Sequence, residues 1–132
     1  MSDHFMIEPT QIAQLTYVDA GHGLAVYCDA NAASKRLNEQ GGPPAGINPE
    51  FIYSSASQRL APGGRILIVS DGLVEQRSGD SQACEFGFES VIRLAAETDR
   101  SPDLVVAVFD ALAAHAASTH LADDATAICV QW

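Results

Sequence analysis

The sequence predicts a single α+β domain. Strand patterns occupy much of the first 70 residues, two helical patterns lie between Phe88 and His115, and an apolar run comes close to the end of the chain. With 132 residues, of which 47% are hydrophobic and 18% are charged, the chain is long enough for one domain with a core and too short for two of ordinary size. We therefore expect residues 1–132 to form one domain.

The first strand signals follow an extended stretch at residues 1–9 that Pro9 ends. Residues 14–19 are rich in β-forming side chains, residues 20–23 form a glycine-containing turn, and residues 24–28 are apolar again. This pattern predicts a β-hairpin. His22 in the turn has two interpretations, as a ligand or proton carrier and as a local hydrogen-bonding residue.

A long connection follows the predicted hairpin. Residues 29–49 are rich in polar residues, glycine and proline and predict a loop, with a short strand near Arg36 and Leu37. Because binding residues concentrate on loops, this one can line a substrate groove or can simply be a solvated connection. Residues 51–55, which include Phe51 and Tyr53, predict a further strand.

The strongest strand signal is the run of four branched apolar residues at 66–69, which predicts a strand buried on both faces. Pro62-Gly63-Gly64 precedes the run and Ser70-Asp71-Gly72 follows it. The strand end places the Asp71 carboxylate where the sheet meets solvent, and Gly72 allows a sharp exit. Asp71 is therefore a candidate metal ligand, although Asp-Gly after a strand is also an ordinary turn sequence.

Two helices and a final strand complete the predicted elements. Four apolar residues from Phe88 to Ala95 recur at helical spacing. A second helix begins at Ser101, a good N-cap, with Pro102 at the first helical position, and its apolar face extends to His115. Residues 127–130 then predict a terminal strand.

Asp123 and Asp124 stand just before the terminal strand, 52 and 53 residues beyond Asp71. If this strand lies beside the one that ends at Asp71, the carboxylates converge, and a cation would offset their repulsion. Oxygen ligands without a neighbouring histidine or cysteine favour Mg²⁺ or Mn²⁺ over zinc. The alternative is that Asp123 and Asp124 form a solvated turn, and the charge pattern alone does not separate the two interpretations.

Charge and cysteine content limit the function classes. The formal net charge of −10 argues against nucleic acid or an anionic membrane surface as the main partner. The three cysteines have no CxxC spacing, so we expect reduced thiols and a cytoplasmic location. No apolar stretch is long enough to span a membrane.

Six motifs together resemble one protein family. The chain resembles the SpoIIE and RsbU-like bacterial branch of the PP2C (PPM) serine/threonine phosphatases, in motif order and approximate spacing over nearly its whole length. The motifs are Ala20-Gly21-His22, Pro43-Pro44-Ala45-Gly46, Pro62-Gly63-Gly64, Ser70-Asp71-Gly72-Leu73-Val74-Glu75, Phe86-Gly87 and Asp123-Asp124-Ala125-Thr126.

The resemblance implies a PP2C-like αββα sandwich of antiparallel sheets flanked by helices, with two Mn²⁺ or Mg²⁺ ions at one end. It also implies that Asp71 and Asp123 are metal ligands, and that Gly72, Asp124 and Thr126 support them. It implies no catalytic residue beyond the ligands and no catalytic role for His22.

The chain also departs from the family pattern. An Asp-Gly-x-Gly-His-Gly-like motif, which in the family supplies the aspartate that bridges the two metals, is absent before Gln14. We therefore expect a partial domain that corresponds to the C-terminal portion of the family fold, truncated at its N-terminus. It would bind one metal or none and have weak or no activity alone. A sheet that lacks strands exposes edges and apolar faces, so we also expect a homodimer or a swapped assembly.

Two functions follow as expectations. The first is a metal-dependent serine/threonine phosphoprotein phosphatase of bacterial signalling, which by resemblance acts on a phosphorylated STAS-type anti-sigma-factor antagonist. The second is a non-catalytic pseudophosphatase that retains only binding or scaffolding capacity.

Overall fold

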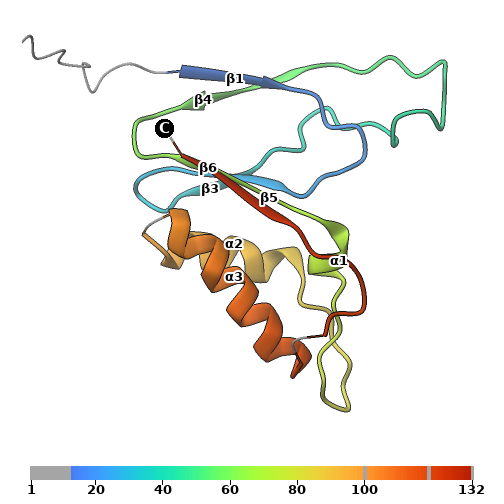
Figure 1. The fold of residues 1–132 in the computed structure, drawn as a ribbon. Coiled ribbons are helices and arrows are strands. Elements are labelled where there is room, and N and C mark those ends of the chain that lie inside the picture. Colours follow the sequence, from blue (N-terminus) through green and yellow to red (C-terminus); the bar gives the residue numbers. More distant parts are fainter. Residues whose placement is uncertain (1–12, 100, 119, 132) are drawn as a thin grey trace, which may run out of the picture.

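The computed structural model describes residues 13–99, 101–118 and 120–131, and in this part of the chain the elements form three layers. Helices cover one face of a four-stranded sheet, and a two-stranded sheet lies over part of its other face (Figure 1). The predicted α+β domain with antiparallel sheets is confirmed. The extended stretch predicted at residues 1–9 lies outside the described residues.

The four-stranded sheet has the order β3-β2-β5-β6, and all of its neighbours are antiparallel. Its strands are β2 (Ala25–Cys28), β3 (Ser34–Arg36), β5 (Arg65–Val69) and β6 (Ala127–Gln131). The predicted strands at 66–69 and 127–130 are both confirmed, and so is the short strand near Arg36. Because β6 pairs with β5, the segments that carry Asp71 and Asp123 meet at one end of the sheet.

The two-stranded sheet consists of β1 (Ala13–Tyr17) and β4 (Ala56–Leu60). The predicted hairpin of residues 14–28 is therefore wrong, because β1 and β2 belong to different sheets. The turn between them packs against the loop near Pro44 rather than folding back on itself. The Asp19 carboxylate accepts a hydrogen bond from Gly23 N at 3.0 Å, the Asp19 carbonyl accepts one from Gly42 N at 3.0 Å, and Gly21 lies directly against Pro44.

The strand predicted at residues 51–55 is also wrong, because β4 begins only at Ala56. The aromatic side chains pack on the preceding loop instead of joining a sheet. Phe51 and Tyr53 contact each other edge to face at 4.9 Å, and the Tyr53 hydroxyl donates a hydrogen bond to the Pro43 carbonyl at 2.6 Å. Ile52 projects into solvent and is 87% exposed.

Three helices follow β5 in the described residues. The short helix α1 (Asp71–Val74) directly continues the chain beyond β5, whereas a sharp turn at Gly72 was predicted there. The helices α2 (Phe88–Glu97) and α3 (Ser101–Ala116) match the two predicted helices closely. No helix in the described part of the chain combines the length and the apolar character needed to cross a bilayer.

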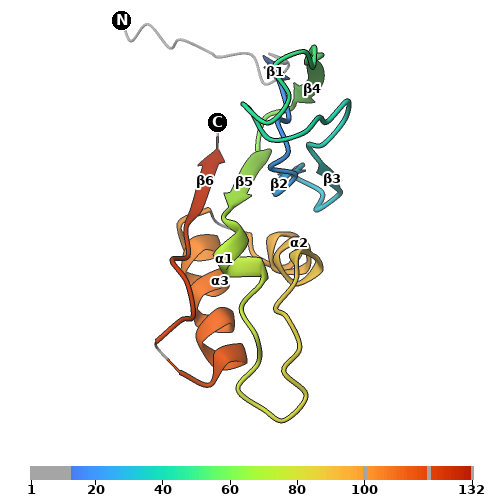
Figure 2. The same cartoon turned by 90° about the vertical axis from the view of Figure 1, so that its right-hand side faces the viewer.

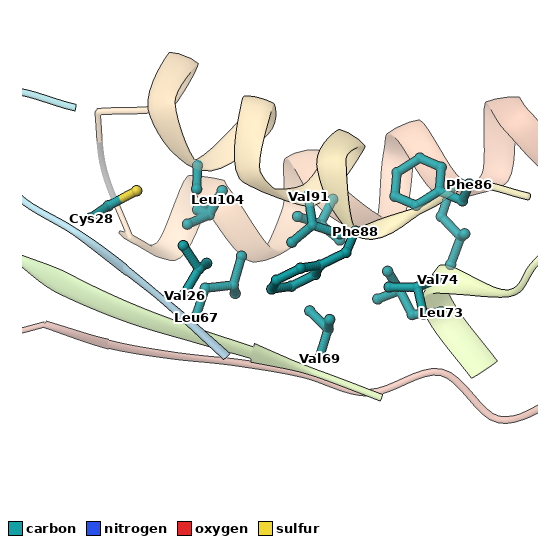
Figure 3. Close-up of a cluster of buried hydrophobic side chains, with 13 residues drawn as sticks. Val26, Cys28, Leu67, Val69, Leu73, Val74, Phe86, Phe88, Val91 and Leu104 are labelled. Atoms are coloured by element: carbon teal, nitrogen blue, oxygen red, sulfur yellow. The ribbon is translucent and has the colours of Figure 1, made fainter. Parts of the chain in front are cut away.

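The main core lies between the four-stranded sheet and the helices. Figure 3 shows strand residues Val26, Leu67 and Val69 facing helix residues Val91 and Leu104, and all five side chains are almost fully buried. Phe88 lies in the middle of this cluster. Cys28 extends the cluster at one end, and Leu73, Val74 and Phe86 extend it at the other. Burial also raises the pKa of the Cys28 thiol above its usual value. This core fixes the position of β5 and therefore of the residues that follow it.

A smaller core joins the two sheets. Tyr27, Leu37, Leu60 and Ile66 are buried between them. The two-stranded sheet does not cover the outer face of the four-stranded sheet completely, since Ile68 is 36% exposed. The prediction that residues 66–69 are buried on both faces is therefore wrong for Ile68. The open space here is an apolar cavity of about 440 Å³ that reaches from Leu15 to Val130.

Candidate metal-binding site

The antiparallel pairing of β5 and β6 builds the candidate site. Val69 at the end of β5 pairs with Ala127 at the start of β6, so the segments beyond these residues run side by side. Ser70 N donates to the Thr126 carbonyl at 2.9 Å, and Thr126 N donates to Ser70 Oγ at 2.9 Å. This double contact holds the Ser-Asp-Gly segment against the Asp-Asp-Ala-Thr segment. The two strands are therefore neighbours, and the segments that carry Asp71 and Asp123 lie side by side.

Gly72 makes the closest approach between the two segments. It is buried in α1, and a Cβ atom at this position would overlap the Asp124 carbonyl oxygen and lie 3.3 Å from Asp123 Cβ. The glycine is therefore needed for close packing of two backbones and not for the sharp exit that was predicted. Of the predicted supporting residues, Gly72, Asp124 and Thr126 all act here through their backbones.

The two predicted ligands, Asp71 and Asp123, are exposed, and the carboxylate of each accepts a hydrogen bond from the backbone of the next residue. Asp71 Oδ1 accepts a hydrogen bond from Gly72 N at 2.8 Å, and Asp123 Oδ1 accepts one from Asp124 N at 2.7 Å. Both residues lie just beyond the paired ends of β5 and β6, where they are accessible to solvent. In Figures 1 and 2, α1 and the segment that leads into β6 lie next to each other.

A cavity of about 590 Å³ opens beside Asp71. Its polar lining comes from His22, Ser70, Asp71 and Glu75, and its described lining includes no lysine or arginine. Such a cavity is electrostatically favourable for a cation and unfavourable for a bare phosphate. Asp123 is not among the residues that line it.

Two residues near the site are outside the predicted set of ligands and supporting residues. His22 lines the cavity with Asp71, and its Nδ1 accepts a 3.3 Å hydrogen bond from Leu24 N. Gln76 is buried, and its Oε1 accepts a hydrogen bond from Ala122 N at 2.9 Å, which ties the exit of α1 to the residue before Asp123. The glycine turn marked His22 only as a candidate, and a glutamine in a polar stretch carries no signal of this kind.

A metal ion needs several ligands that converge on one point. Asp71 and Asp123 supply oxygen ligands of the type that Mg²⁺ and Mn²⁺ prefer. Among the described residues, however, no three histidine, cysteine, aspartate or glutamate side chains gather closely enough to form a metal site. The described residues thus do not fit a complete metal centre.

Solved structures with a similar fold include PP2C phosphatase domains. The SiaA-PP2C domain of Pseudomonas aeruginosa matches 90% of this chain with a TM-score of 0.71 and 23% identity, and the match covers 46% of that domain's chain. The phosphatase domain of SpoIIE from Bacillus subtilis (Mn presoaked) matches 90% of this chain with a TM-score of 0.64 and 16% identity, covering 50% of its own length. The RsbU and RsbW domains of Rv1364c from Mycobacterium tuberculosis match 89% of this chain with a TM-score of 0.65 and 23% identity, covering 32% of that chain. The fold is therefore that of PP2C-type phosphatase domains.

The sequence model of the stage II sporulation protein E family matches residues 5–132. The chain belongs to the SpoIIE family, and its fold is that of PP2C-type domains. It spans half or less of the length of these three solved chains. No curated protein sequence matches the chain.

Proposed function

We propose that this chain carries part of the metal site of a serine/threonine phosphoprotein phosphatase, with Asp71 and Asp123 as two ligands of Mn²⁺ or Mg²⁺. The observation that supports it most is the pairing of β5 with β6, which brings both aspartates to one end of the sheet. The acidic lining of the adjacent cavity adds support, because a phosphate group could approach it only with a cation present.

The proposed substrate is a phosphorylated STAS-type anti-sigma-factor antagonist in the bacterial cytoplasm. Membership of the SpoIIE family and the fold shared with RsbU and SpoIIE domains support this class. The formal net charge of −10 makes nucleic acid and anionic membranes poor alternatives. Reduced thiols, expected from the cysteine spacing, accord with the cytoplasmic location.

A phosphatase assay tests this proposal. The full chain is incubated with Mn²⁺ and either p-nitrophenyl phosphate or the phosphorylated antagonist, next to Asp71→Asn and the control Asp110→Asn on the exposed surface of α3. We expect weak, manganese-dependent turnover that Asp71→Asn lowers by about 100-fold or more and that Asp110→Asn leaves unchanged. Turnover without metal, or no detectable turnover, would count against this chain as an enzyme by itself.

One observation favours a second candidate, a non-catalytic pseudophosphatase that only binds a partner. The described residues offer two aspartates at the sheet end and no cluster of three metal-ligating side chains. Under this alternative, Asp71→Asn and Asp123→Asn leave binding to the antagonist unchanged and the chain takes up no Mn²⁺. Tight uptake of Mn²⁺ at two sites would exclude it.

A further inference from the structure

The cavity beside Asp71 has two walls of different chemistry. One wall runs from the end of β5 into α1 and contributes the Asp71 and Glu75 carboxylates and the Ser70 hydroxyl. The other wall is the turn between β1 and β2, and its polar side chain in the described lining is that of His22. The cavity therefore brings an imidazole together with two carboxylates.

The backbone of Leu24 fixes His22 relative to Asp71. Leu24 N donates a hydrogen bond to His22 Nδ1 at 3.3 Å, and the Leu24 carbonyl accepts one from Val69 N at 3.1 Å. Val69 is the last residue of β5 and precedes Asp71 by two positions. A single residue thus joins the imidazole to the strand end that carries the candidate ligand.

The turn that carries His22 is braced on both sides of the histidine. The buried Asp19 carboxylate accepts a hydrogen bond from Gly23 N at 3.0 Å. Gly21 has a φ of +81° and packs directly against Pro44, where a side chain would clash. Because an ordered turn loses little conformational freedom when a ligand contacts it, His22 is preorganised for binding.

The hydrogen bond from Leu24 also sets the tautomer of His22. Because Nδ1 accepts, the proton of the neutral ring is on Nε2, and Nε2 is a donor. A phosphoryl oxygen accepts a hydrogen bond from such a donor, whereas a metal ion needs a nitrogen that carries no proton. The ring is therefore arranged to contact an anion and not to ligate a metal ion.

We propose that His22 binds the phosphoryl group of the substrate, with Nε2–H donating a hydrogen bond to a phosphoryl oxygen. This role rests on the proposed function, because a cation must offset the charges of Asp71 and Glu75 before a phosphate group can enter. His22 then supplies a donor on the wall that carries no carboxylate. The cavity volume of about 590 Å³ lies in the usual range for small-ligand sites.

Two successive titrations of the full chain, followed by NMR, test this role. Mg²⁺ is added first, and the signals of Asp71 and Asp123 report on the proposed function. Inorganic phosphate is then added at saturating Mg²⁺, and we expect it to shift the Nε2 signal of His22. The ring signals of His115 and His120, which lie outside the described lining of the cavity, should stay unchanged.

Two variants separate a phosphate contact from a structural role of His22. His22→Leu removes the donor, and we expect the phosphate dissociation constant to rise by about tenfold or more, the effect of one hydrogen bond to a charged group. His22→Gln keeps an N–H donor near the position of Nε2 and should recover most of that affinity. His120→Leu, at an exposed position, is the matched control and should bind phosphate like the unmodified chain.

The outcomes distinguish the role of His22 from the proposed function. Three results would overturn the phosphate contact and leave the proposed function standing: no phosphate binding at saturating Mg²⁺, phosphate binding that His22→Leu leaves unchanged, or an equal loss of Mg²⁺ and phosphate affinity in His22→Leu. Absence of Mg²⁺ binding by the unmodified chain would instead contradict the proposed function and, with it, this role of His22.

Discussion

Replacing Gly72 with alanine is expected to lower the free energy of unfolding by about 3 kcal/mol, the upper end of the range for overpacking. The added methyl group would overlap the Asp124 carbonyl oxygen, and neither α1 nor the backbone before β6 can move without breaking the Ser70–Thr126 contacts. Helix propensity alone favours alanine over glycine by about 1 kcal/mol. A loss of stability in the variant would therefore come from the close packing and not from helix propensity. Urea denaturation measures the change.

Gly46→Ala is the control for this variant. Gly46 has a φ of +88° with nothing near a built Cβ atom, so alanine there carries only the cost of a left-handed backbone, about 1 kcal/mol. A loss at Gly72 no larger than at Gly46 would show that the two segments do not pack as closely as described.

Replacing Leu67 with alanine is expected to cost about 2–5 kcal/mol of unfolding free energy. Leu67 is 1% exposed, lies beside Val26 on the sheet and faces the helices in the main core, so its removal leaves a cavity that the rigid sheet cannot close (Figure 3). Thermal and urea unfolding monitored by circular dichroism measure the loss.

Ile68→Ala provides the comparison within the same strand. Ile68 is 36% exposed on the opposite face of the sheet, and its loss should cost less than about 2 kcal/mol. Equal losses at the two positions would contradict a core that lies on the helical side of β5.

The elements that the sequence predicted correctly are those with strong local signals. The branched apolar run of β5 and the helical periodicity of α2 and α3 needed no knowledge of distant residues. β4 has no such signal, since Ala56–Leu60 is a mostly polar segment that becomes a strand through pairing with β1. The neighbouring aromatic residues Phe51 and Tyr53 have higher β propensity and remain in the loop.

The predicted hairpin failed for a related reason. A glycine turn such as residues 20–23 has the same composition whether the chain returns within a sheet or crosses to another one. The choice depends on contacts of Asp19 and Gly21 with the loop around Gly42 and Pro44, which lie more than twenty residues further along the chain.

The candidate site was predictable in outline. Two carboxylates beside buried strands indicated Asp71 and Asp123, and the antiparallel register of β5 and β6 brings their segments together. The role of Gly72 in close packing and the tether from Gln76 to Ala122 depend on three-dimensional contacts that no sequence spacing encodes.

A calorimetric titration with Mn²⁺ tests most directly whether Asp71 and Asp123 belong to one metal site. The unmodified chain should bind Mn²⁺, Asp71→Asn and Asp123→Asn should each weaken binding by about 10-fold to 100-fold, and Asp110→Asn should have no effect. Because both aspartates would hold the same ion, the double variant should lose less than the product of the two single effects. Absence of Mn²⁺ uptake by the unmodified chain, or undiminished uptake by either single variant, would contradict the shared site.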